Sequence, residues 1–150
     1  MEFRKPGPVY SALVGLTASH TRAHIVRAIL EGVAFSLRDT FEIFKEMNVP
    51  VDEIRLGGGG ARSPLWRQIQ ADIYGRAVRI VEAEEGAAYG AALLAGVGAG
   101  AWASVNEACN SVVRIKSETE PGPETVGLMD RQYQMFRRVY PALQPLHAGQ

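Results

Sequence analysis

The segment LGGGGARSP, residues 56–64, has the residue types of a loop that binds a ligand through its main chain. Four consecutive glycines at 57–60 leave no side chain between the backbone and a bound molecule. Ser63 and Pro64 then carry the signals of a helix start, a capping hydroxyl followed by proline at the first helical position. Because the free N–H groups and the dipole of a helix N-terminus favour phosphate, this combination predicts a nucleotide site.

The loop does not fit either of two common nucleotide-binding patterns. A P-loop needs Lys directly after its last glycine, where this chain has Ala61 and Arg62. The dinucleotide fingerprint, counted from Gly57 or Gly58, needs its last small residue where Arg62 or Ser63 stands. A flexible turn without a ligand remains the alternative, although a helix start directly after the glycines argues against a plain linker.

Other residue patterns are weaker candidates for chemistry. His20 and His24 have the spacing of metal ligands on a helix. No third ligand lies nearby in the sequence, so we expect a pair at a helix start and assign no metal ligand. The acidic residues Glu82, Glu84 and Glu85 could suit Mg²⁺. They also lie just before a predicted helix whose dipole they would stabilise, which is the plainer interpretation.

The elements that position the loop follow from hydrophobic spacing. A short strand is predicted at 53–56, directly before the glycines. The helix after the loop begins at Ser63 and ends at Gly75, a residue suited to a left-handed cap. A second strand, Val78–Val81, and a helix of small residues at 87–94 follow. The small side chains would let that helix lie close to the sheet or to another helix.

A long helix of about 26 residues precedes the loop. Ser19 or Thr21 can cap its start. The Asn48 and Pro50 pair ends it. Gly32 inside this helix indicates close packing against a neighbouring element. One face of the helix carries a recurring set of apolar residues, Val26, Ile29, Val33, Leu37, Phe41 and Phe44.

Further elements are predicted at both ends of the chain. A strand is expected at 9–14, a short helix at 104–108 and a last strand at 112–115. A final helix is expected to end at Pro141 and Pro145. Its apolar face, which we expect in the core, comprises Val126, Met129, Tyr133, Phe136 and Tyr140.

The alternation of strands and helices predicts an α/β fold with a mainly parallel sheet, right-handed crossovers and flanking helices. The sheet would have only three or four strands, which is few for a domain of 150 residues. The sequence therefore has the pattern of part of a larger unit.

Composition excludes several classes of protein. The 16 Lys and Arg balance the 16 Asp and Glu, and 47% of residues are apolar, which argues against disorder and against a nucleic-acid partner. No apolar run approaches the ~20 residues of a membrane span, and the start MEFRKPGP has no secretory signal. The single Cys109 cannot form an internal disulfide and has no His near it in sequence that would make it a nucleophile. A cytoplasmic location is expected.

Three segments and the tail YPALQP resemble the FGGY carbohydrate kinases. The segments are GLTASHTRAHIVRAILEGVAFSLRD at 15–39, RLGGGGARSPLWRQIQADIYG at 55–75 and EEGAAYGAALLAGVGAG at 84–100. The resemblance implies a fold of two actin-like, ribonuclease-H-like domains with the active site in the cleft between them. Residues 1–150 would be the C-terminal portion of the second domain, without the N-terminal sugar-binding domain.

The middle segment is similar to the family's adenosine motif. By that resemblance, Gly58, Gly59 and Gly60 would lie along the α-phosphate and ribose of ATP. Ala61 would line the adenine pocket, and Ser63 would offer a polar contact near the base. The Mg²⁺ that accompanies ATP in these kinases would be held mainly by residues outside this chain.

The resemblance assigns no catalytic residue to the chain. The family's general base is an Asp near the start of the second domain, which would precede Met1. We expect four aspartates to be solvated or structural, because none lies in a matching motif: Asp39, Asp52, Asp72 and Asp130.

The implied reaction transfers the γ-phosphoryl group of ATP to a hydroxyl of a sugar. The resemblance is strongest to family members that act on the pentulose D-xylulose, while members that act on glycerol, gluconate or ribulose are the alternatives. A nucleotide-binding or assembly module without turnover is the alternative from another class. We expect the chain alone to be inactive, and its incompletely covered helix to cause self-association into homo-oligomers.

Overall fold

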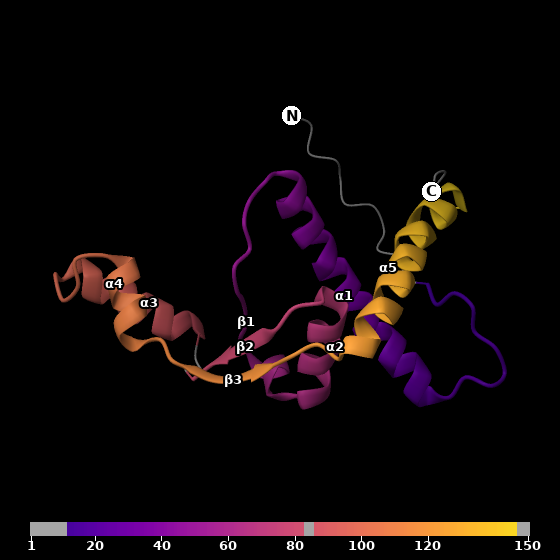
Figure 1. Cartoon of the computed structure of the whole chain (residues 1–150), viewed down its shortest axis with the longest axis horizontal. Helices are drawn as coiled ribbons and strands as arrows, with labels where there is room; N and C mark the ends of the chain where they lie inside the picture. The colour runs from indigo at the N-terminus through magenta and orange to yellow at the C-terminus, as the bar shows by residue number, and fades with distance from the viewer. Residues whose placement is uncertain (1–11, 83–85, 147–150) are drawn as a thin grey trace.

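The computed structural model describes residues 12–82 and 86–146, drawn in colour in Figure 1. Its elements in chain order are α1 (Arg22–Glu46), β1 (Ile54–Leu56), the 3₁₀ turn η1 (Gly59–Arg62), α2 (Pro64–Tyr74), β2 (Val78–Val81), α3 (Gly86–Gly98), α4 (Val105–Val112), β3 (Ile115–Thr119), α5 (Pro123–Leu143) and the 3₁₀ turn η2 (Gln144–Leu146). This is the α/β fold class that the sequence predicts.

The three strands form a mixed sheet in the order β1-β2-β3. β1 and β2 are parallel, with Ile54 opposite Val78, whereas β3 is antiparallel to β2. The last strand was therefore predicted too early in the sequence, and the sheet is mixed where the alternation of elements suggested mainly parallel strands. α3 and α4 form a hairpin that returns the chain to the carboxyl end of β2, where the Glu82 N–H donates to the Arg114 carbonyl at 2.9 Å. β3 starts at that end and has to run back along β2.

The main core lies between α1, α2 and α5, beside the sheet (Figure 1). Its buried residues are Ala34, Phe35, Ile69, Ile73, Met129 and Tyr133. A second, smaller cluster of Ile54, Ala71 and Val78 joins α2 to β1 and β2. α2 thus contacts the two long helices with one face and the sheet with another. Tyr133 and Phe136 pack in the core as predicted, but Tyr140 is exposed.

The predicted helix ends are confirmed where capping is local. Thr21 is the N-cap of α1, and Ser104 caps α4 by accepting a hydrogen bond from the Glu107 N–H at 3.1 Å. Gly75 ends α2 in the left-handed conformation at φ 63°. Asn48, just beyond α1, has φ 56°.

Two further predictions, a strand near the N-terminus and the end of the last helix, are wrong. Residues 12–14 do not form a strand, because no described strand runs beside them to pair with their N–H and C=O groups; residues 9–11 lie outside the described part. Pro141 lies inside α5, which continues to Leu143. Near a helix end, proline removes only one of the last hydrogen bonds, so the helix does not have to stop there.

The apolar face of α1 is only partly covered. Ala34 and Phe35 face the core, while Val26, Ile29, Val33 and Leu37 are exposed. A Cβ on Gly32 would meet nothing within 4 Å, so close packing does not explain this glycine within the described chain.

α3 and α4 lie at the opposite end of the molecule from α1 and α5 (Figure 1). A Cβ on Gly96 of α3 would overlap the ring of Trp102, which lies in the connection between α3 and α4. A Cβ on Gly90, within the small-residue segment at 87–94, would meet nothing within 4 Å, so no close approach is seen at that glycine.

Candidate functional site

The glycine segment forms an ordered turn between β1 and α2. Gly58 has φ 75°, a conformation that side chains disfavour, and its carbonyl accepts a hydrogen bond from the Ala61 N–H at 3.2 Å. The Ser63 N–H bonds to the Gly60 carbonyl at 3.1 Å. The Ser63 hydroxyl in turn accepts from the Trp66 N–H at 3.3 Å, which caps α2. The segment is therefore a hydrogen-bonded 3₁₀ turn that leads directly into a helix.

A cavity of about 490 Å³ opens beside this turn, at the carboxyl ends of the parallel strands β1 and β2. This is the edge at which open α/β sheets bind ligands, and the volume falls in the range of small-molecule sites, roughly 300–1,000 Å³. Its lining comprises Leu56, Gly57, Gly58, Ala61, Arg62, Arg67, Ile80, Val81, Glu82, Lys116 and Ser117.

The structure places the five predicted site residues differently with respect to this cavity. Gly58 and Ala61 line it, while Gly59, Gly60 and Ser63 do not. A Cβ on Gly59 would point into open space, whereas one on Gly60 would touch the Trp66 ring at 3.4 Å.

Sequence reasoning missed three basic residues of the cavity, Arg62, Arg67 and Lys116. Arg67 lies at the start of α2, and its Nη1 donates to the carbonyls of Ala61 at 2.9 Å and Arg62 at 3.4 Å. Lys116 comes from β3 and reaches the loop only because β3 pairs with β2. No local spacing in the sequence relates Lys116 to the glycines.

Glu82 lines the same cavity, although the plainer interpretation of its sequence position was stabilisation of a helix start. Glu84 and Glu85, the other members of that acidic set, lie outside the described residues. Within residues 12–82 and 86–146, no group of three His, Cys, Asp or Glu side chains could hold a metal ion.

His20 and His24 act as local acceptors at the start of α1. The backbone N–H of Thr17 donates to His20 Nδ1 at 3.0 Å, and that of Thr21 donates to His24 Nδ1 at 3.1 Å. The two rings lie 5.6 Å apart, edge to face. Each imidazole therefore satisfies a backbone donor, as a helix-start pair would.

Three of the four aspartates have structural contacts. Asp72 is buried, and its Oδ1 accepts from the Gly122 N–H and from Gln68 Nε2, both at 2.8 Å. Asp39 accepts a hydrogen bond from the Tyr133 hydroxyl. Asp130 pairs with Arg38 Nη1 at 2.7 Å.

Asp52, the fourth aspartate, is exposed beside a smaller cavity of about 250 Å³. This second cavity lies at the amino ends of β1 and β2, the edge of the sheet away from the glycine turn.

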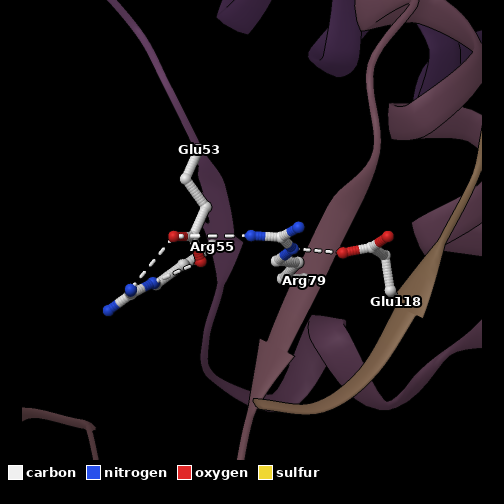
Figure 2. Close-up of polar contacts among 4 residues, drawn as sticks. All are labelled: Glu53, Arg55, Arg79 and Glu118. Atoms are coloured by element: carbon white, nitrogen blue, oxygen red, sulfur yellow. Dashed lines mark hydrogen bonds and ion pairs between the residues drawn. The ribbon is translucent and has the colours of Figure 1, made fainter. Parts of the chain in front are cut away.

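Charged side chains cross the strands of the sheet (Figure 2). Glu53 binds Arg55 through Oε1 to Nε at 2.6 Å and lies 3.6 Å from Arg79 Nη1, while Arg79 donates to Glu118. The hydrogen bond from Arg55 lowers the pKa of Glu53, and the one from Arg79 lowers the pKa of Glu118. Carboxylates held ionised in this way are poor general acids. These four charged residues therefore support the pairing of the strands and do not form an acid–base pair for catalysis.

No helix in the described part of the chain is long and apolar enough to cross a bilayer.

Comparison with known proteins identifies relatives over most of the chain. The family model for the FGGY family of carbohydrate kinases, C-terminal domain, matches residues 7–99. Xylulose kinase of Bacillus subtilis is 34% identical over 132 residues, which are 88% of this chain and 26% of that protein. A glycerol kinase of Saccharolobus islandicus is 38% identical over 110 residues, 73% of this chain and 22% of the kinase.

A solved structure supports the same family relationship. The crystal structure of xylulose kinase from Rhodospirillum rubrum superimposes with a TM-score of 0.82 at 32% identity, over 94% of this chain and 29% of that one. The chain thus spans between a quarter and a third of the length of the xylulose kinases it matches.

Proposed function

The chain belongs to the FGGY family of carbohydrate kinases, and on that premise we propose that it forms the adenosine-binding part of an ATP-dependent sugar kinase. The observation that carries this proposal is the cavity at the carboxyl ends of β1 and β2, bounded by the glycine turn. The glycine turn exposes its main chain to the cavity, and basic side chains add positive charge to the lining. Both features suit a phosphorylated nucleoside.

The residues of the cavity fit a nucleotide in size and charge. Among the described residues, the cationic Arg62, Arg67 and Lys116 and the acidic Glu82 line it. The resemblance adds contacts from Gly58, Gly59 and Gly60 to the α-phosphate and ribose, from Ala61 to adenine and from Ser63 to the base. ATP, when bound, supplies the phosphoryl group, and this chain's part is to hold and orient the adenosine end. Such positioning is a large part of phosphoryl-transfer catalysis.

The described residues do not fit a complete Mg²⁺ site, because none of their acidic and histidine side chains gather in threes. By the family resemblance, the metal ligands, the general base and the sugar-binding residues lie in a further part of the kinase. Residues 1–150 are then the C-terminal portion of its second domain, and we propose that this chain alone does not turn over sugar.

For the whole kinase we propose D-xylulose as the acceptor, giving D-xylulose 5-phosphate. The support is the name of the relatives from Bacillus subtilis and Rhodospirillum rubrum. Glycerol is the specific alternative, because the Saccharolobus glycerol kinase is 38% identical over its shorter match. We also propose a cytoplasmic location, since both substrates are metabolites, and self-association of the free chain through α1.

The test of the nucleotide site is Gly59→Val, measured by calorimetric titration with ATP. Gly59 has no positive φ, and its Cβ would meet no atom within 4 Å, so valine should leave the melting temperature nearly unchanged. We expect the branched side chain beside the phosphates to weaken ATP binding about tenfold or more, about the value of one lost charged hydrogen bond.

Gly90→Val, also in open space but on α3, is the matched control and should bind ATP normally. Unchanged affinity in Gly59→Val would contradict the proposed contact of Gly59 with nucleotide. ATP binding that is unaffected by D-xylulose is expected of this chain. Sugar-dependent ADP release would overturn its proposed inactivity.

A further inference from the structure

We propose that Arg67 contacts the bound nucleotide directly, donating from its Nε edge to a phosphate oxygen while its Nη1 holds the glycine turn. The proposal rests on the proposed function of the cavity and extends it by naming the residue that recognises the anionic part of the ligand.

The first argument is the orientation of the guanidinium. Nη1 donates to the carbonyls of Ala61 and Arg62, at 2.9 and 3.4 Å. These bonds tie the side chain to the last residues of η1. A planar guanidinium fixed through Nη1 has its Nε edge fixed as well, because the five N–H donors form one rigid fork.

The second argument is that this edge lacks an acceptor. Arg67 Nε is buried, and no hydrogen-bond partner for it exists among the described residues. Arg67 itself lines the cavity beside the glycine turn. Proteins seldom leave a buried charged donor unpaired, and an exception calls for water, an ion or a ligand as its partner. The oxygen of a phosphate group is an acceptor that the guanidinium fork matches well.

The third argument is the charge of the surroundings. Lys116 lines the same cavity, and within residues 12–82 and 86–146 the acidic side chain of its lining is Glu82. A cavity with this excess of cations favours an anionic group over a neutral hydroxyl. Lys116, carried by β3, adds positive charge from the strand side, whereas Arg67 approaches from α2.

The experiment compares adenosine with ADP, which differ only in the phosphates. We expect Arg67→Met to weaken ADP binding about tenfold or more in calorimetric titration of the 150-residue chain and to change adenosine binding less than about twofold. Arg67→Lys should recover part of the ADP affinity, because it restores the charge without the fork.

Arg114→Met is the matched control. Arg114 also donates to backbone carbonyls, those of Asn110 and Ser111, but it does not line the cavity. ADP binding should not change in this variant.

A second measurement does not depend on the folding of any variant. In the NMR spectrum of the unmodified chain, ADP should shift the Arg67 Nε–H resonance and adenosine should not. Equal weakening of adenosine and ADP in Arg67→Met, with an unshifted resonance, would mean that Arg67 only holds the turn and would overturn the proposal. ADP binding that ignores Arg67 would also overturn it while leaving the proposed function intact. Failure of both ligands to bind the unmodified chain would overturn the proposed function itself, and this proposal with it.

Discussion

Tyr133 joins the two longest helices through its hydroxyl group. It is 1% exposed, donates a hydrogen bond to Asp39 of α1 and lies with its ring centroid 4.3 Å from the guanidinium carbon of Arg38. Arg38 continues the connection, since its Nη1 donates to the Ile73 carbonyl of α2 at 2.8 Å and pairs with Asp130 of α5. Burial, followed by the hydrogen bond to Asp39, raises the pKa of Tyr133 from 10.0 to about 12.

This raised pKa predicts a loss of stability at alkaline pH. The folded state holds the Tyr133 proton more tightly than the unfolded state, so its contribution is complete below pH 10.0 and disappears as the pH rises to about 12. Tyr133→Phe should lower the free energy of unfolding by ~1 kcal/mol at neutral pH, because Asp39 loses its donor. It should also flatten the alkaline decline seen in urea unfolding followed by circular dichroism.

Burial also raises the pKa of Tyr74 to about 12, so Tyr74→Phe should flatten a separate share of the same decline. A Tyr133→Phe variant that keeps the whole decline would disprove the role of Tyr133.

At the scale of the element, α2 has local sequence signals at both of its ends, and it contributes to the candidate site. Ser63 caps it, Pro64 is its first residue and Gly75 closes it. Its first turn supplies Arg67 to the cavity, while Ile69, Ala71 and Ile73 are fully buried between the sheet and the other helices. The first turn of α2 faces the cavity, and the rest of the helix is held in the core.

Substitution of Ser63 separates the cap from the ligand contact. Ser63→Ala should lower the free energy of unfolding by ~1 kcal/mol, because the Trp66 N–H loses its acceptor. Ser63→Asp should keep the cap but place a negative charge beside the anionic nucleotide, and so bind ATP more weakly than Ser63→Ala in calorimetric titration. The same two changes at Ser104, the N-cap of α4, should affect stability in the same way without affecting ATP. Equal or tighter ATP binding by Ser63→Asp would show that Ser63 lies away from the bound nucleotide.

On the scale of the whole molecule, the outer face of α1 lacks a cover. Val26, Ile29, Val33 and Leu37 are between 44% and 54% exposed and lie on one side of the helix. An apolar strip of this kind favours association. In the longer relatives, most of the polypeptide lies outside the part that this chain matches.

We expect the free chain to form dimers or larger species in light scattering. The double variant Ile29→Lys, Val33→Glu should shift it to monomers without loss of helix content, since both positions are exposed. Val105→Glu, at an exposed apolar position on α4, is the control and should leave the association unchanged. A wild-type chain that stays monomeric at high concentration would contradict the prediction.

The sequence by itself determined the features that depend on interactions within a few residues. The caps at Ser63 and Ser104 and the left-handed end at Gly75 connect groups no more than four positions apart, so their residue types suffice to predict them. For the first helix the residue types left Ser19 and Thr21 as candidates, and the structure has Thr21 as the cap. The glycine turn could be located for the same reason, because it lies between a strand and a helix start that local spacing reveals.

Only the tertiary structure decided which distant groups meet. The face of α1 that is buried depends on where α2 and α5 lie, so Ala34 and Phe35 enter the core. Of the more regular apolar stripe, Phe41 packs on the second cluster, while Val26, Ile29, Val33 and Leu37 remain exposed. The cavity likewise needs β3 to run antiparallel on β2, which brings Lys116 beside a loop that ends more than fifty residues earlier. Such contacts follow from the relative placement of whole elements, which one-residue propensities and short-range periodicity do not encode.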